Sequence, residues 1–117
     1  MDNNLYEKAY SFSIRIVRLY HYLSKEKREF VISRQVLRSG TSIGANVAEA
    51  NGAISVSDFS AKISIAYKEC LETKYWLCLL KDTGIITKPS YNSIYNNADE
   101  LGKILFSILR TTRISCQ

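Results

Sequence analysis

Apolar residues recur along the chain at spacings of three and four residues, which is the pattern of a buried face of an α-helix. Over residues 4–24 these spacings alternate as in a heptad seam, and the polar run SKEKRE then ends the pattern. The periodicity resumes over residues 30–52, 57–83 and 89–112. Four helices of this length with short connections predict an all-α protein, an antiparallel up-down four-helix bundle.

Residues that favour helix ends lie between these segments. Ser55 and Asp58 are suited to the N-terminal cap of the third helix, and Gly84 is suited to its C-terminal cap. Pro89 fits the first turn of the fourth helix, because that position needs no backbone N–H. The third segment carries apolar residues on two flanks, which predicts burial on more than one side.

The composition is that of one globular helical domain. The chain has 117 residues, of which 46% are hydrophobic and 23% are charged, so we interpret residues 1–117 as a single domain. One proline and five glycines are too few for a many-stranded β fold. The longest apolar run, Tyr75–Leu80, is far shorter than the roughly 20 residues of a membrane span. With no signal-peptide pattern at the N-terminus, we expect a soluble, cytoplasmic protein without a membrane partner.

Residue types that support catalysis or metal binding are sparse. Cys70, Cys78 and Cys116 have no CxxC spacing, and we interpret them as free thiols that pack as small hydrophobic residues. His21 is the single histidine, with no cysteine or serine nucleophile near it in sequence, and the two ExxH motifs of a di-iron bundle are absent. We therefore predict that the protein is not an enzyme and has no catalytic residues, metal site or cofactor.

The net charge of +5 is concentrated in one part of the chain. Residues 15–38 hold seven basic and two acidic residues, whereas the rest of the chain holds nine of each. A solvated helix face normally mixes signs, because like charges four residues apart repel. The excess predicts an anionic partner, and the candidate nucleic-acid-binding residues are Arg15, Arg18, Lys25, Lys27, Arg28, Arg34 and Arg38.

Arg34 and Arg38 are four residues apart and share a helix face. They lie in the first half of the second predicted helix, where the helix dipole does not favour cations. Two kinds of partner fit this placement: phosphate, or a carboxylate of a neighbouring helix or subunit. Candidate carboxylates are Glu49, Glu69 and Glu72, which could act as general acids or bases only if buried in a cleft. The sequence leaves both interpretations of the two arginines open.

A stripe of small residues follows the second predicted helix at one-turn spacing. Glycine costs about 1 kcal/mol relative to alanine inside a helix, so its repetition requires a reason. Close approach of another helix provides one, whereas a phosphate-binding loop is disfavoured because GTSIG lacks the GK[ST] ending of a P-loop. The candidate helix-packing residues are Gly40, Gly44, Ala48 and Gly52.

The run RQVLRSGTSIGANVAEA at residues 34–50 resembles the signature of a bacterial four-helix-bundle family, the 23S rRNA intervening-sequence proteins, also labelled S23 ribosomal proteins. Phe59, Glu69 and Trp76 of the third segment resemble the same family, and the resemblance covers nearly the whole chain. The resemblance implies assembly into a homopentameric barrel. It also implies kinship with the accessory variability determinant of diversity-generating retroelements, a basic barrel that engages a reverse transcriptase and nucleic acid.

Two functions are consistent with these features. The first is a non-enzymatic oligomeric module that binds nucleic acid, either DNA or structured, rRNA-related RNA, through the basic segment. Eight tyrosines are more than one bundle needs, and because interfaces favour tyrosine they predict a homo-oligomer. The alternative is a protein-interaction scaffold whose basic surface docks an acidic or polymerase-like partner. Salt-dependent binding of rRNA fragments would distinguish the two.

Overall fold

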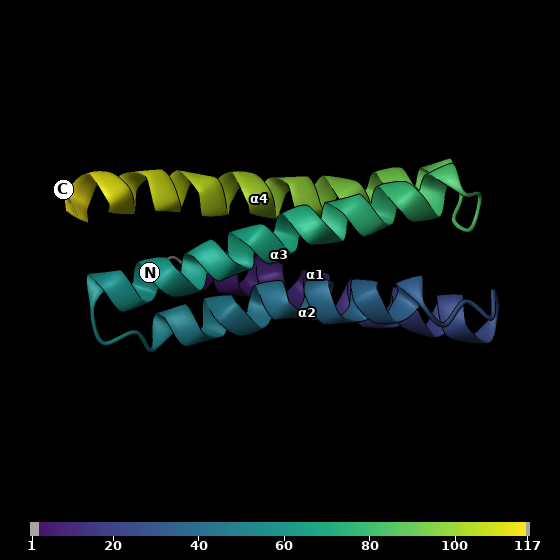
Figure 1. Cartoon of the computed structure of the whole chain (residues 1–117), viewed down its shortest axis with the longest axis horizontal. Helices are drawn as coiled ribbons and strands as arrows, with labels where there is room; N and C mark the ends of the chain where they lie inside the picture. Colours follow the sequence, from purple (N-terminus) through teal and green to yellow (C-terminus); the bar gives the residue numbers. More distant parts are fainter. Residues whose placement is uncertain (1–2, 117) are drawn as a thin grey trace.

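The computed structural model describes residues 3–116, which form four α-helices (Figure 1). These are α1 (Asn3–Lys25), α2 (Ile32–Asn51), α3 (Val56–Asp82) and α4 (Lys88–Cys116). Consecutive helices run antiparallel, so both ends of the described chain lie at the same end of a bundle that measures 47 × 22 × 21 Å. No strand occurs between residues 3 and 116. The predicted all-α four-helix architecture is confirmed.

The observed helix bounds differ from the predicted ones by at most two residues, except at the end of α4. This helix continues to Cys116, beyond the predicted end at residue 112. Leu109 packs into the core, and the Thr112 hydroxyl donates a 2.7 Å hydrogen bond to the Ile108 carbonyl.

The core consists of the apolar stripes that the periodicity indicated. Fully burying one leucine, isoleucine or phenylalanine stabilises a fold by about 1.5–3 kcal/mol, so these stripes dominate the stability of the bundle. Among the described residues, no helix combines the length and apolar character that crossing a membrane requires. The largest fully buried side chains are Leu5, Phe12, Ile16, Leu23, Val36, Ile43, Val47, Ile63, Leu77, Leu80, Leu101 and Leu105.

Local hydrogen bonds define both ends of α3. The Ser55 side chain accepts a 3.0 Å bond from the Asp58 N–H, and the Asp58 carboxylate accepts a 3.3 Å bond from the Ile54 N–H. At the other end Gly84 has φ +77°, a left-handed conformation that glycine adopts without strain. Pro89 is the second residue of α4. The predicted caps of α3 and the predicted position of Pro89 are therefore confirmed.

The small-residue stripe of α2 packs against α1 over only half its length. A Cβ atom at Gly40 would lie 2.7–2.9 Å from the Ile16 side chain, and one at Gly44 would lie 3.3 Å from the Ala9 carbonyl oxygen. Ala48 and Gly52 are exposed, so the prediction of helix packing is wrong for them within the described chain. Residues four apart on a helix of 3.6 residues per turn drift by about 40° per step, so the stripe turns toward solvent.

The interface between α1 and α4 is the most open of the four interfaces between neighbouring helices. Polar side chains bridge it: Lys8 forms a 3.0 Å ion pair with Glu100, and Arg15 bonds to Ser93. Two hollows of about 300 and 680 Å³ lie along this groove, on either side of Arg15. The bundle is thus tightly packed at three of its helix interfaces and open at the fourth, where polar side chains make the bridge.

Because Gly40 has no room for a side chain, Gly40→Ala is expected to lower the free energy of unfolding by about 1 kcal/mol. The free-energy cost of overpacking, about 1–3 kcal/mol, outweighs the gain of about 1 kcal/mol from the higher helix propensity of alanine. Gly102→Ala is the matched control, because its Cβ would lie at an ordinary 3.4 Å from the Cys70 sulfur. Urea unfolding measures both, and a Gly40→Ala variant as stable as the parent would contradict the close contact.

Candidate nucleic-acid interface

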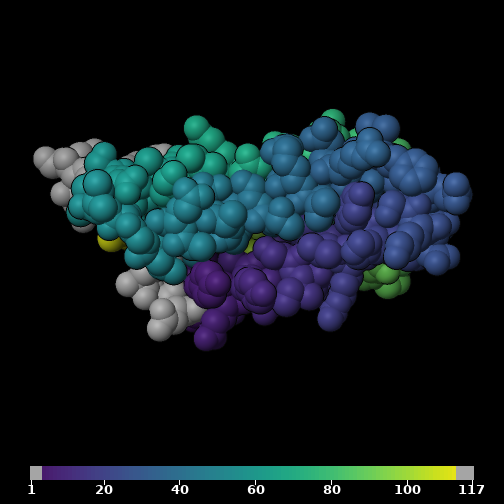
Figure 2. Space-filling view, turned by 90° about the horizontal axis from the view of Figure 1, so that it is seen from below, coloured from purple at the N-terminus to yellow at the C-terminus, as the bar shows by residue number. Residues whose placement is uncertain are grey.

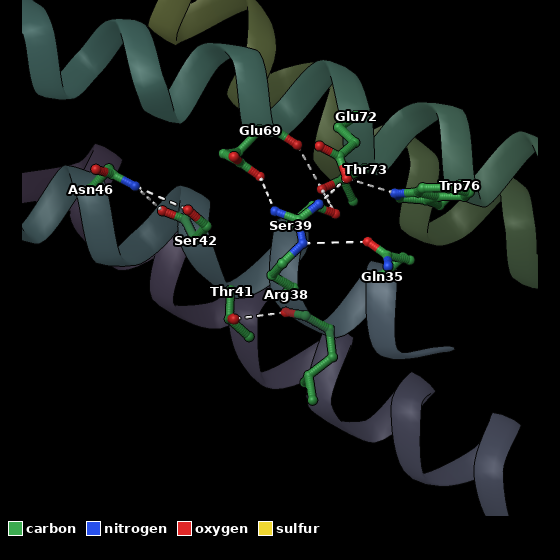
Figure 3. A network of polar contacts seen from close by, with 11 residues as sticks. Gln35, Arg38, Ser39, Thr41, Ser42, Asn46, Glu69, Glu72, Thr73 and Trp76 are labelled. Carbon is green, nitrogen blue, oxygen red and sulfur yellow. Dashed lines mark hydrogen bonds and ion pairs between the residues drawn. The ribbon is translucent and has the colours of Figure 1, made fainter. Parts of the chain in front are cut away.

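Arg38 belongs to a polar network between α2 and α3 (Figure 3). Its guanidinium pairs with Glu69 at 3.2 Å and with Glu72, and its Nε lies 3.4 Å from Gln35 Oε1. Glu72 also accepts a 2.9 Å bond from the Trp76 indole N–H. Arg38 thus takes the carboxylate partners that the sequence left as one of two alternatives, while its role in nucleic-acid binding stays a prediction.

The hydroxyls of this region serve helix packing. The Thr73 hydroxyl lies 2.9 Å from the Ser39 hydroxyl, and both side chains are buried between α2 and α3 beneath the Arg38 network (Figure 3). Thr41 donates back to the Leu37 carbonyl of its own helix at 2.7 Å. Every buried polar side-chain atom of the described residues has a hydrogen-bond partner. These hydroxyls bond to backbone carbonyls and to each other, so their hydrogen bonds contribute to helix packing.

Arg15 reaches from α1 across the groove to α4. Its two terminal nitrogens bond to the Ser93 carbonyl at 3.3 Å, the Ser93 hydroxyl at 3.0 Å and the Asn97 amide oxygen. All of these partners are neutral, in contrast to the carboxylates that hold Arg38. Arg15 is therefore fixed in position while its positive charge stays uncompensated.

The remaining candidates are exposed and make no ion pair within residues 3–116. They belong to the segment that runs from the second half of α1 through the turn to the first part of α2, and this segment forms one end of the bundle (Figure 2). Of the acidic residues in the segment, Glu26 is exposed and Glu29 is used as a helix cap. The structure thus brings together Arg18, Lys25, Lys27, Arg28 and Arg34 at the end opposite the chain termini.

Glu29 holds the start of α2. Its carboxylate accepts bonds from the backbone N–H groups of Val31, Ile32 and Ser33 at 3.1, 3.0 and 2.7 Å. Burial acts to raise the pKa of Glu29, but these backbone bonds outweigh it, and the pKa lies below its ordinary value. Arg28 beside it has φ 53°, a left-handed conformation that costs a residue with a Cβ about 1 kcal/mol. Sequence reasoning treated this stretch only as a polar break.

Lys88 is a basic residue that sequence reasoning missed. It is exposed at the start of α4, and its neighbours Thr87 and Pro89 line the same hollow as Arg18 and Tyr22 of α1. Residues 60 positions apart or more thus share one surface, which the pattern of either helix alone does not reveal. Lys88 extends the basic end of the bundle, which we define as Arg18, Lys25, Lys27, Arg28, Arg34 and Lys88.

The candidates for catalysis and metal binding do not form a site. His21 is exposed, with its ring 5.6 Å from that of Tyr20. Cys70 is buried, which raises its pKa to about 11, and its thiol donates to the Ala98 carbonyl at 3.1 Å. Cys78 is half-buried, and the Cys116 side chain lies outside the described part of the structure. Among the described residues, no three histidine, cysteine or acidic side chains are placed to hold a metal ion.

Comparison with known proteins supports the family resemblance. Residues 1–107 match the family described as 23S rRNA-intervening sequence protein. The chain is also similar to a solved structure, a protein with unknown function from the S23 ribosomal protein family of Bacteroides thetaiotaomicron. The two share 51% sequence identity and a TM-score of 0.91, over 93% of this chain and 97% of that one. No curated protein matches the chain.

Charge reversal should distinguish the roles of Arg34 and Arg38, for which the sequence left two interpretations open. Arg38→Glu is expected to lower the free energy of unfolding by about 1–3 kcal/mol, because it places a third carboxylate beside Glu69 and Glu72. Arg34→Glu, an equal change of charge at an exposed site on the same helix, should leave the stability within about 0.5 kcal/mol. Equal unfolding midpoints for the two variants would show that the network adds nothing to stability.

Proposed function

The chain belongs to the 23S rRNA-intervening sequence protein family, and from this premise we propose that it is a non-enzymatic, self-associating helical bundle that binds structured, rRNA-related RNA. One observation carries the proposal: Arg18, Lys25, Lys27, Arg28 and Arg34 lie at one end of the bundle with no carboxylate paired to them. Elsewhere the basic side chains include several that are neutralised, among them Lys62 by Glu49 and Lys74 by Asp99. Unpaired basic residues are therefore concentrated at this end, although Lys68 and Arg110 are also exposed and form no ion pair within residues 3–116.

A polyanion with several phosphate groups fits this surface better than a single small anion does. The cross-section of the bundle is 22 × 21 Å, and exposed cations distributed over its end can contact several phosphates of a folded RNA. Such contacts position a nucleic acid without reading its sequence. The side chains of Tyr22 and Phe30 are each 45% exposed in this region and offer aromatic surfaces for unpaired bases.

Self-association is supported by apolar stripes on two helices that do not touch each other. The α1 stripe consists of Tyr6, Tyr10, Ile14 and Val17, and the α3 stripe consists of Leu71 and Tyr75, which are four residues apart and share a helix face; all six are exposed. Because α1 and α3 lie diagonally across the bundle, the two stripes face different directions.

We propose that the α1 stripe of one copy packs on the α3 stripe of the next. A contact between two different surfaces generates a ring when its rotation closes, and the family resemblance implies five subunits. Five copies would together carry a net charge of about +25 and place several basic ends on one assembly. This raises the affinity for a polyanion beyond what one subunit provides.

Replacing Lys27 and Arg34 together by alanine is expected to weaken binding of a labelled 23S rRNA fragment. The slope of log affinity against log salt should also flatten by about 0.7–0.9 for each phosphate that the variant no longer neutralises. The control replaces Lys68 and Arg110, exposed basic residues away from this end, and removes the same charge. Equal weakening by both pairs would contradict a local RNA site. If the parent binds no RNA at any salt concentration, the protein-scaffold alternative is favoured.

Glutamate substitutions in the stripes test the proposed assembly. Tyr10→Glu and Tyr75→Glu should each give a smaller assembly by light scattering, because each buries a charge in the interface. An equimolar mixture of the two variants should recover a dimer, since each retains the stripe that the other lacks. Tyr22→Glu, at a tyrosine outside both stripes, should keep the parent mass. A parent mass of 13.3 kDa would overturn self-association.

A further inference from the structure

The larger hollow of the α1–α4 groove has the form of a ligand pocket. Its volume of about 680 Å³ lies within the range of small-molecule sites. Leu19, Ile86 and Ile94 line it with apolar surface, and Ile86 and Ile94 are buried. The hydroxyl residues Thr87, Ser90 and Ser93 lie around the same hollow. An apolar floor with a few polar groups is the usual composition of such a site.

The charge of this pocket is wholly positive. Arg15 and Arg18 line it, and none of the described residues around it is acidic. Arg15 is held in place by neutral partners only, on Ser93 and Asn97, and Arg18 makes no ion pair among residues 3–116. The neighbouring smaller hollow differs, because Glu7 and Glu100 line it. Arg18 offers a free guanidinium as a bidentate donor for phosphate, and Arg15, whose terminal nitrogens already bond to Ser93 and Asn97, adds a second positive charge without a carboxylate partner.

Tyr22 adds an aromatic surface to the same pocket. Arg15, Arg18, Leu19 and Tyr22 occupy positions i, i+3, i+4 and i+7 of α1, so they share one helix face toward the start of α4. The Tyr22 side chain is 45% exposed, and the Lys27 ammonium lies over its ring, 6.0 Å from the ring centre. A ligand that meets all of these groups is an anion with a planar body, which is the chemistry of a nucleotide.

Building on the RNA-binding function proposed above, we infer that this pocket receives one unpaired nucleotide of the bound RNA. Its phosphate contacts Arg15 and Arg18, and its base packs on Tyr22 above the apolar floor. Paired bases are enclosed in the helix stack and do not enter a pocket, whereas bulged bases are free to do so. Arg18 also belongs to the basic end, so the stem of the same RNA extends over the remaining cations of that end.

The test compares two labelled RNA hairpins with the same stem, one of which carries a single bulged adenosine. The parent protein is expected to bind the bulged hairpin about tenfold more tightly, a difference typical of one stacked base. Arg18→Gln and Tyr22→Ala should abolish this preference. Ser90→Trp should also abolish it, because it fills the pocket without removing a charge. Circular dichroism confirms that each variant keeps its helix content.

Lys25→Gln is the matched control, because it removes one charge from the basic end but does not line the pocket. It should weaken binding of both hairpins equally and leave the bulge preference intact. Equal affinity of the parent for the two hairpins would overturn the pocket while leaving RNA binding by the basic end standing. Failure of either hairpin to bind at low salt would overturn both proposals.

Discussion

Close contact between α1 and α2 at Gly40 and Gly44 determines how the other helices are arranged. With no side chain on α2 at these positions, the Ile16 side chain and the Ala9 backbone of α1 come within van der Waals distance of it. The Ser39–Thr73 hydrogen bond and the Arg38 ion pairs join α2 to α3 on its other side. On its side toward α4, by contrast, α1 makes few contacts, and polar side chains bridge a groove with an apolar floor.

Basic residues of the segment 15–38 divide by the kind of partner they have. Carboxylates neutralise Arg38, so its contribution is to stability. Neutral oxygen atoms hold Arg15, which fixes its position without cancelling its charge. The exposed residues of the basic end have neither kind of partner. A preorganised cation beside a set of exposed cations suits a ligand that has both one inserted group and an extended anionic chain.

Sequence periodicity was sufficient for the helices, and residues such as Ser55 and Gly84 were sufficient for the caps of α3, because both depend on local spacing; the Glu29 cap of α2 was missed. The rotation of the small-residue stripe toward solvent at Ala48 and Gly52 also follows from helix geometry. The regular four-residue spacing nevertheless suggested one continuous packing face. The partner of Arg38 and the pocket between α1 and α4 were not decidable from sequence, because they depend on which helices lie side by side. Lys88 was missed for the same reason.

The even number of helices has a mechanical consequence. Because residues 3 and 116 lie at the same end of the bundle, a force that pulls the chain ends apart acts across the α1–α4 interface rather than along it. That interface is the most open one and is bridged by polar contacts, so it separates first and the helices peel away one after another. A bundle that is loaded in this direction therefore unfolds one helix at a time and at low force.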